Sequence, residues 1–378
     1  MQRFDVLVVG GRCAGAAAAM LMARRGLRVL AVDRGGYGTD TLSTHALMRG
    51  AVMLLHRWGV LPRLIEAGTP PIRRTTFHYG TEAVAVDLRP GDGVDALIAP
   101  RRTLLDSVLV DAAWEAGAEL RHHHSVTGLL RDAGGRVTGA MVVDEAGQEY
   151  AVAAGLVVGA DGVGSTVARL AGAPVMETAR HAAAVVYGYW PGLADTGTHW
   201  HYGIGASAGR IPTNAGRHCV FASVSADHAR VEMRGNRLHA MHRILREVSP
   251  SLAEEVAASA PDDALVAFAG RRGFLRQAAG PGWALIGDAG YFKDPITAHG
   301  ITDALRDAAL LAEAATEGTD AAFARFAARR DDLSLPLFRV TDEIASYRWT
   351  LEEAKAMHLA LNTAMKREVA ALAAEPVP

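Results

Sequence analysis

Three aspartates stand at positions where ligand chemistry is expected. Asp33, Asp161 and Asp288 each lie at or just beyond the end of a short apolar run with glycines beside it. Such a run is typical of a buried strand, so each carboxylate is expected at the carboxyl end of a strand. A strand-end acid that leads into a helix N-terminus can hold a polar ligand, because the acid binds hydroxyl groups and free backbone amides favour anions.

The first aspartate closes a pattern of strand, glycine turn, helix, strand and acid. The first strand is Phe4–Val9, the turn covers residues 10–15, and a small-residue helix leads to the strand that ends at Asp33. The length and order predict a dinucleotide-binding unit, in which Gly10 permits the tight turn and Gly15 lets the helix pack closely. The helix N-terminus then faces a pyrophosphate, and Asp33 binds the hydroxyls of an adenosine ribose.

This turn departs from the usual glycine pattern at one position. The middle glycine of G-x-G-x-x-G lets the backbone approach the phosphates, and Arg12 stands there in this chain. Because Asp33 occupies the required strand end, dinucleotide binding is still predicted. Two roles stay open for the Arg12 side chain: it either offers charge to a phosphate or points outward.

The third aspartate lies in the stretch Trp283–Ala304, around which the rest of the chain is organised. A short apolar strand ends at Gly287-Asp288, a loop with Pro295 and Gly300 follows, and a helical pattern runs over 303–315. By itself this stretch allows two interpretations. It is either a ligand-binding loop or an ordinary connection in which the aspartate is a cap.

Composition excludes several classes of protein. The chain has 378 residues, 50% of them hydrophobic and 21% charged, with a formal net charge of −2. These values fit a globular protein with a large core and give no reason to expect a nucleic-acid partner. Only Cys13 and Cys219 occur, so no disulfide framework is expected and a cytoplasmic location is predicted.

Two further features are false leads. The apolar stretch Phe4–Met22 is interrupted by Asp5 and Arg12, so no export segment or membrane insertion is expected. The histidines at 122–124 are adjacent in sequence and alternate between the two faces of a strand, so they do not form a compact ligand set. No metal site is predicted.

Together, the three motifs resemble those of the FAD-dependent monooxygenases of the p-hydroxybenzoate hydroxylase type. The first is V-V-G-G-R-C-A-G with Asp33, the second is G-A-D-G-V-G-S-T-V-A-R, and the third is G-D-A-G followed by D-P-I-T-A-H-G-I-T-D-A. The resemblance covers Phe4 to about Ala315. It implies FAD as cofactor, with NADH or NADPH as reductant.

The expected fold class is α/β, with a Rossmann-like FAD-binding domain, an inserted and mostly antiparallel substrate-binding sheet, and C-terminal helices. Aromatic and β-branched residues dominate Val175–Asp263, which is why a sheet is expected there. The predicted FAD-binding domain comprises residues 1–72, 98–174 and 270–325. The substrate-binding domain comprises 73–97 and 175–269, and a helical segment covers 326–378.

The resemblance also assigns expected roles to individual residues. The turn would surround the FAD pyrophosphate, Arg102 would reach the cofactor from its helix, and Asp161 would support the pyrophosphate region. Asp288 would bind the ribityl hydroxyls, and the loop Pro295–Ile301 would present backbone amides to the flavin. The full set of expected cofactor-binding residues is Gly10, Arg12, Cys13, Ala14, Gly15, Asp33, Arg34, Thr44, Arg102, Val126, Asp161, Gly287, Asp288, Pro295, Ala298, His299, Gly300 and Ile301.

The implied activity is hydroxylation of a small, electron-rich aromatic or natural-product-like substrate by dioxygen, through a flavin hydroperoxide. Candidate pocket residues are His45, Tyr187, Tyr189, His201, Tyr202 and Arg210. His45 either faces the flavin or substrate or caps a helix. The family often has glycine and asparagine where Ala298 and Thr302 stand, which leaves the geometry of the flavin loop open.

Three rival functions share this fold. A geranylgeranyl-type reductase would saturate carbon–carbon bonds without dioxygen, and a non-catalytic FAD redox sensor would turn nothing over. Flavin-dependent halogenases usually carry a W-x-W-x-I-P segment, and no Trp pair with that spacing occurs here. Oligomeric state stays open.

Overall fold

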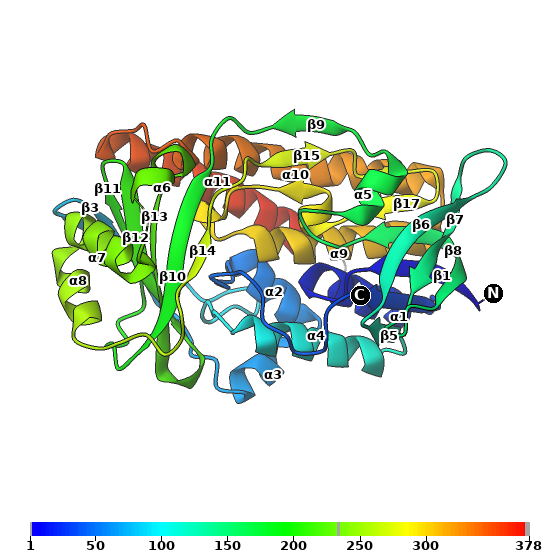
Figure 1. Ribbon diagram of the computed structural model, residues 1–378, viewed down its shortest axis with the longest axis horizontal. Helices are drawn as coiled ribbons and strands as arrows, with labels where there is room; N and C mark the ends of the chain where they lie inside the picture. Colours follow the sequence, from blue (N-terminus) through cyan, green and yellow to red (C-terminus); the bar gives the residue numbers. More distant parts are fainter. Residues whose placement is uncertain (1, 233–234, 375–378) are drawn as a thin grey trace.

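The computed structural model describes residues 2–232 and 235–374. A parallel sheet with its helices forms one half, at the right of Figure 1, and an antiparallel sheet forms the other half, at the left. The long C-terminal helices run along both halves. Within the described residues, no helix combines the length and apolar character needed to cross a membrane.

The parallel strands lie in the order β17-β8-β1-β2-β5. A hairpin, β6–β7, pairs antiparallel with β8 on one side, and the short β16 pairs with β17 at the edge. The strands of this sheet are β1 (Gln2–Val9), β2 (Val29–Asp33), β5 (Glu119–His122), β6 (Ser125–Arg131), β7 (Val137–Val143), β8 (Glu149–Gly159), β16 (Ala279–Gly280) and β17 (Trp283–Leu285).

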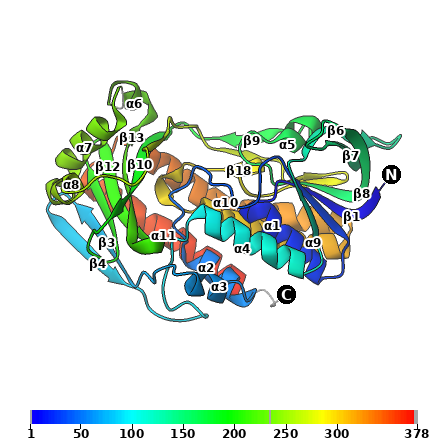
Figure 2. The same cartoon turned by 60° about the horizontal axis from the view of Figure 1, so that its bottom comes forward.

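Side chains of β1 alternate between two cores, as the period of two in a strand requires. Val6 and Val8 pack with the helices on one face, which Figure 2 shows together below the strands. Leu7 and Val9 pack with the hairpin and α5 on the other face. The helices of this half are α1 (Cys13–Arg24), α2 (Arg49–Arg57), α3 (Leu61–Glu66), α4 (Arg102–Glu115), α5 (Thr166–Ala171) and α9 (Gly300–Glu317).

The antiparallel sheet has the order β14-β10-β13-β12-β11-β3-β4, in which only the β3–β11 pair is parallel. One face is covered by α7 and α8, with Val186, Val220 and Met241 in the core between them. The elements are β3 (Arg74–Tyr79), β4 (Glu82–Asp87), β10 (Ala183–Pro191), β11 (Thr198–Gly203), β12 (Ala206–Thr213), η1 (Asn214–Gly216), β13 (Arg217–Ser225), α6 (Ala226–Glu232), α7 (Arg237–Val248), α8 (Pro250–Ala257) and β14 (Val266–Phe268).

A small third sheet and two long helices connect the halves. β9 (Val175–Thr178), β15 (Phe274–Arg276) and β18 (Tyr291–Phe292) pair with one another, so β9 lies outside the antiparallel sheet in which it was expected. α10 (Asp320–Ala345) continues through Pro336, and α11 (Leu351–Ala373) contacts both β11 and α2. The remaining short turns are η2 (Gly287–Ala289) and η3 (Pro295–Thr297).

The predicted fold class is confirmed: an α/β dinucleotide-binding half is combined with a mostly antiparallel sheet and C-terminal helices. The exact domain boundaries stay a prediction. The pairing of β3 with β11 does place the segment 74–87 in the same sheet as 183–225.

Candidate cofactor and substrate site

The ends of the parallel strands meet at one edge, as the motifs require. Backbone hydrogen bonds join them, from Gly10 N to Val32 O (2.8 Å), from Ala160 N to Val9 O (2.8 Å) and from Ile286 N to Gly159 O (3.0 Å). Asp33, Asp161 and Asp288 therefore all follow strands that end at this edge, which is where open α/β sheets bind ligands.

The glycine turn leaves no room for side chains. Gly10 has a φ of 105°, and a Cβ there would lie 2.3 Å from the carbonyl oxygen of Ala160. A Cβ on Gly15 would lie 1.7 Å from the Gly10 carbonyl oxygen. In this part of the described chain, α1 has no side-chain cap at its N-terminus, so its first amides are available to an anion. The turn thus fits a pyrophosphate.

The backbone conformation of Arg12 is one that any residue can adopt, so glycine is not required at this position. Its backbone is extended, with φ −91° and ψ −162°. The guanidinium turns away from the turn and donates to Thr39 Oγ1 at 3.1 Å, to the carbonyl oxygen of Asp40 at 3.2 Å and to Asp106 Oδ2 at 3.3 Å. Of the two roles left open by the sequence, the geometry favours a side chain that ties the loop after β2 to α4.

Asp106 is a residue that sequence reasoning missed. Its buried carboxylate accepts hydrogen bonds from Arg12, from the Cys13 thiol at 2.9 Å and from Arg102 at 3.0 and 3.2 Å. Burial raises the pKa of Cys13, so this thiol stays protonated and donates. The available signal was the spacing of four residues between Arg102 and Asp106, which places them on one helix face. Arg102 therefore has its anionic partner within its own helix.

Asp33 lies between the turn and the following loop. Its carboxylate accepts hydrogen bonds from Gly11 N at 2.5 Å and from Gly35 N at 2.6 Å, while Arg34 is exposed. Val126 is buried beside this region and pairs with Val142 in the hairpin. The two amides hold the Asp33 carboxylate at the strand end, where its free lone pairs fit ribose hydroxyls.

Replacing Asp33 by asparagine should weaken binding of the adenosine half of the cofactor by roughly 10- to 100-fold, the cost of one or two charge-assisted hydrogen bonds. The probe is ADP, which lacks the flavin half, titrated into apo-protein by calorimetry. Asp263→Asn, an exposed change in the other half of the molecule, serves as the control. An unchanged ADP affinity in Asp33→Asn would exclude the ribose contact.

Asp161 is engaged within the chain itself. Its carboxylate accepts from Ser165 Oγ at 2.5 Å and from Thr166 N at 2.6 Å, at the start of α5. Gly162 beside it has a φ of 77° and open space around its Cβ position. Asp161 thus shapes the turn that follows β8, and this supports a positioning role at the edge.

Asp288 combines two properties that fit a ligand site. It is exposed to solvent, whereas Gly287 and Ala289 on either side of it are buried. Yet the surrounding protein excludes enough water to raise its pKa to about 6, against the opposing charges of Lys293 and Arg102. A carboxylate that a ligand can reach but that is poorly hydrated is suited to accept hydrogen bonds from the hydroxyl groups of that ligand.

The loop after Asp288 is anchored to β10 by hydrogen bonds, and parts of it are exposed to solvent. Asp294 accepts from Ala183 N at 2.6 Å and from Ile296 N at 3.0 Å, which ties the loop to β10. Pro295 and Gly300 are exposed, and a Cβ on Gly300 would meet nothing within 4 Å. In this described loop, α9 has no side-chain cap. Its first amides are therefore free to bind a ligand at the place expected for the flavin.

Ala298 explains one departure from the family pattern. Its φ is 49° and its ψ is 37°, in the left-handed region, where glycine is favoured. Alanine adopts this conformation at a cost of about 1–2 kcal/mol. Alanine therefore occupies a left-handed position here without a glycine. Thr302 is fully buried, and its hydroxyl has no hydrogen-bond partner among the described residues.

The His299 side chain points into the protein, away from the open side of the loop. It is 1% exposed, and its Nε2 lies 2.6 Å from Glu368 Oε2 on α11. Glu368 also accepts from Arg306, which in turn binds Asp303 and Asp307. Glu368 and Arg306 were missed from the sequence, because the contact between His299 and Glu368 joins residues 69 positions apart.

His45 bridges two segments of the chain. Its Nδ1 lies 3.1 Å from the carbonyl oxygen of Ala99 and its Nε2 lies 3.0 Å from the Tyr189 hydroxyl. Burial lowers the pKa of His45 to about 3, aided by the nearby Arg101 cation, so the ring is neutral. The Tyr187 hydroxyl likewise accepts from Ser43 N at 3.0 Å. These contacts hold the loop after β2 against β10, and His45 does not cap a helix.

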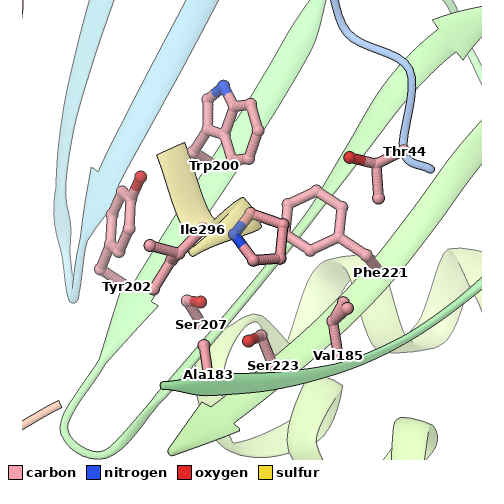
Figure 3. Close-up of a pocket in the computed structure, with 10 residues that line it drawn as sticks. Thr44, Ala183, Val185, Trp200, Tyr202, Ser207, Phe221, Ser223 and Ile296 are labelled. Atoms are coloured by element: carbon pink, nitrogen blue, oxygen red, sulfur yellow. The ribbon is translucent and has the colours of Figure 1, made fainter. Parts of the chain in front are cut away.

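A pocket lies between the antiparallel sheet and the flavin loop (Figure 3). Figure 3 shows Ile296 of η3 facing Trp200, Tyr202 and Phe221 of the sheet. Of the described residues that line this pocket, none is charged. The lining comprises Thr44, Ala183, Val185, Trp200, Tyr202, Ser207, Phe221, Ser223, Pro295 and Ile296.

Of the predicted pocket residues, the structure brings only Tyr202 to this lining. His201 is paired with Ala208 and lies on the opposite face, with the core under α7 and α8. Arg210 lies on that same far face, where it binds Glu255 and Thr196. Successive residues of a strand face opposite sides, so the neighbour of a pocket residue points away from the pocket. His201 and Arg210 therefore do not line this pocket, in contrast to their expected place.

A glycine turn against an uncapped helix, with acids after three parallel strands, defines a dinucleotide-binding α/β protein. The chain belongs to the FAD binding domain family, whose model matches residues 3–321 and which includes the monooxygenases of the p-hydroxybenzoate hydroxylase type. The predicted family and the FAD cofactor are thus confirmed. The protein is an FAD-dependent oxidoreductase.

Two curated relatives show that the names of similar proteins cover different activities. The menaquinone reductase of Mycolicibacterium smegmatis is 29% identical over 328 residues, covering 84% of this chain and 77% of that protein. The anhydrotetracycline monooxygenase of Streptomyces rimosus is 33% identical over 175 residues, covering 45% of this chain. This second match spans only 33% of the monooxygenase's own length.

Two solved structures have the same fold over nearly the whole chain. The flavin-dependent brominase Bmp2 has a TM-score of 0.81 at 20% identity, covering 98% of this chain and 93% of that one. PqsL of Pseudomonas aeruginosa, in complex with 2-aminobenzoylacetate, has a TM-score of 0.78 at 20% identity, covering 97% and 100%. At these identities the likeness concerns the fold alone.

Proposed function

We propose that the protein is an NADH- or NADPH-dependent monooxygenase that hydroxylates a small, uncharged, electron-rich ring. The observation that carries the proposal is the pocket between the antiparallel sheet and the flavin loop, because its lining brings Ile296 of that loop against aromatic sheet residues. A substrate bound there would lie beside the expected position of the flavin ring. Dioxygen is the second substrate in this proposal.

The residues at the edge of the parallel sheet would hold FAD. The first amides of α1 would bind its pyrophosphate, Asp33 its ribose and Asp288 its ribityl hydroxyls. Amides of His299–Ile301 would donate to the pyrimidine edge of the flavin, where negative charge develops on reduction. When bound, FAD supplies hydride acceptance from the nicotinamide and the activation of dioxygen.

The lining indicates the class of substrate. Trp200, Phe221 and Ile296 offer flat or branched apolar surface, and the polar groups are the hydroxyls of Thr44 and of residues on the sheet. Burial raises the pKa of Tyr202 well above its ordinary value, so this phenol stays protonated near neutral pH. An uncharged ring with a few polar substituents suits these surfaces, and they exclude water from the reacting atoms.

A reductase is the second candidate, and one observation favours it. The match to the menaquinone reductase covers 84% of this chain, whereas the match to the tetracycline enzyme covers 45%. A reductase would transfer hydride equivalents to its substrate and leave dioxygen unused. A halogenase is less well supported, because Ser207 and Gly209 stand where the segment ending in Ile211-Pro212 would carry its two tryptophans.

Oxygen incorporation separates these functions. Holoprotein is screened with NADH and NADPH against phenols, aminobenzoyl compounds and quinones under ¹⁸O₂. The monooxygenase predicts substrate-stimulated nicotinamide oxidation with one labelled oxygen in the product. Reduction of a quinone under anaerobic conditions, with no label incorporated from any compound, would replace our proposal by the reductase. No nicotinamide oxidation with any compound would favour a redox sensor.

A pair of matched variants tests the pocket. Val185 lines it from β10, whereas Val86 is 49% exposed on β4. Val185→Ala should change kcat/KM for the substrate by roughly tenfold, since methyl groups in a hydrophobic pocket are worth about 1–3 kcal/mol. FAD content and Val86→Ala should stay at the wild-type level. Equal kinetics in both variants would place the substrate elsewhere.

A further inference from the structure

Three histidines gather on the face of the antiparallel sheet that points away from the pocket. His199 and His201 are two residues apart on β11, so they share a face. His78 on β3 is the direct partner of His201 in the parallel pair. The cluster thus combines two segments more than 100 positions apart, and it is separate from the histidines at 122–124.

The ring nitrogens face one another. One nitrogen of each of these histidines lies within 4.8 Å of those of the other two. His78 Nε2 and His199 Nδ1 are 3.0 Å apart, and the rings of His78 and His201 stack with centroids 4.1 Å apart. Three nitrogen donors around one point are a common ligand set for a divalent transition metal.

His201 lies where it can share a ligand with His78. Its side chain is 8% exposed, and among the described residues no hydrogen bond to its ring is found. The rings of His78 and His201 stack with centroids 4.1 Å apart, so one ligand can contact both histidines.

The hydrogen bonds around the cluster define the tautomer of His199. His199 Nε2 lies 2.8 Å from Thr196 Oγ1, so an Nε2–H that donates to this hydroxyl leaves the Nδ1 lone pair facing His78. The nearby Arg210 cation is balanced by its ion pair with Glu255. This tautomer presents an imidazole lone pair toward His78, as metal binding requires.

We propose that His78, His199 and His201 bind one Zn²⁺ or a similar divalent transition-metal ion, with water in the fourth position. Zn–N bonds of about 2.0–2.1 Å require the ring nitrogens to lie about 3.3–3.5 Å apart. The facing nitrogens of His78 and His199, now 3.0 Å apart, must therefore separate slightly. The ion would link the edge hairpin β3–β4 to β11. It lies on the far face from the pocket, so its role is structural.

A second group of possible ligands among the described residues differs in one respect. His299, Asp303 and Glu368 also lie close together, but Lys293 and Arg306 already supply cations to these carboxylates. A metal would have to displace two buried positive charges there. At the three-histidine cluster the nearby cation Arg210 already has its own anion, Glu255.

Metal binding is measured on FAD-loaded protein that has been stripped with a chelator. Zn²⁺ is titrated in competition with a chromophoric chelator, and Co²⁺ is titrated for the visible absorption of a four-coordinate site. We expect about one ion per chain, with His201→Gln and His199→Gln each weakening affinity by more than about 100-fold, since even changes outside the ligand shell cost roughly 10- to 100-fold. His123→Ala, in the other histidine-rich segment, should bind as the wild type does.

Several outcomes would overturn the proposal. If the wild type binds less than about one-tenth of an ion per chain, the three histidines bind no metal and their stacked rings have a packing role only. Binding that persists in His201→Gln and His199→Gln, or that disappears in His123→Ala, would place the ion elsewhere. If a glutamine variant fails to fold, the Co²⁺ spectrum of the wild type still decides, because an octahedral spectrum would exclude the four-coordinate site proposed here. The flavin absorbance of each variant reports independently on the cofactor site.

Discussion

Replacing Arg306 by methionine should lower the free energy of unfolding by about 3–5 kcal/mol, the usual cost of removing one partner from a buried ion network. Arg306 is fully buried and donates to Asp303 at 2.8 Å, to Asp307 at 2.8 and 3.1 Å and to Glu368 at 2.7 Å. Without the guanidinium, three buried carboxylates would face one another with Lys293 as the nearest cation. Chemical unfolding of apo-protein measures the change.

The free energy of unfolding of Arg306→Met should also depend on pH, with a sign that can be predicted. Carboxylates that lose their cation in the folded state have raised pKa values, so the folded state binds more protons than the unfolded state. The free energy of unfolding of Arg306→Met should therefore fall as pH rises from the unfolded pKa values through the raised folded ones. Wild-type protein, in which Arg306 balances these charges, should not show this additional loss.

Two controls distinguish the network from a general loss of arginine. Arg306→Lys keeps the charge but loses the planar fork, so its destabilisation should be smaller than that of methionine. Arg325→Met removes an exposed partner of Glu317 and should cost about 1 kcal/mol or less. If Arg306→Met unfolds within 1 kcal/mol of wild type, the network contributes little to stability.

Changing Asp288 to asparagine should have opposite effects on the apo-protein and on FAD binding. The carboxylate is dehydrated enough for its pKa to rise to about 6, so ionisation opposes folding of the apo-protein at neutral pH. Asparagine carries no charge, and apo-Asp288→Asn should be as stable as wild type or more so. FAD affinity should fall by roughly 10- to 100-fold, because hydrogen bonds from ribityl hydroxyls to a charged acceptor are lost.

The pH profile of apo-protein gives a second readout for Asp288. Between the unfolded pKa of 3.8 and the folded value of about 6, the folded state binds more protons, so the free energy of unfolding falls as pH rises. Asp288→Asn should make this slope smaller, and the part due to Asp294, whose pKa burial raises to about 7, should remain. Urea unfolding at several pH values across that window measures it.

ADP distinguishes the two acids of the cofactor site. Asp288→Asn should weaken FAD binding and leave ADP binding unchanged, because ADP lacks the ribityl chain. Asp33→Asn should weaken the binding of both ligands. Asp263→Asn should change neither affinity. Full flavin content and unchanged turnover in Asp288→Asn would show that the ribityl contact is misplaced.

Local sequence patterns were enough to predict the cofactor edge. The strand at β1, the turn with Gly10 and Gly15, and the acids after β2 and β17 follow from periodicity and from steric limits on the backbone. These are properties of a few consecutive residues. Parallel strands then bring their carboxyl ends to one edge, whatever the rest of the chain does.

Such local patterns could not predict hydrogen-bond partners that lie far apart in the sequence. Arg12 could be assigned no role until its contacts with Thr39 and Asp106 were visible, 27 and 94 positions away. Glu368 reaches the flavin loop from a helix beyond the segment matched by the family model, which ends at residue 321. No local period encodes these partners.

The face of each strand in the antiparallel sheet was also undetermined. Tyr202 lines the pocket while His201, its neighbour, lies under α7 and α8 with Arg210. A shift of one residue in register exchanges the two faces of a strand, and aromatic side chains are common on both.

The amino-acid sequence by itself therefore determined the family, the cofactor and the acids that stand at the strand ends, since each depends on a short motif with a steric or electrostatic requirement. The tertiary structure alone decided which side chains line the pocket, which ones carry the buried charges behind the loop Pro295–Ile301, and which histidines come together, because packing between distant segments selects them.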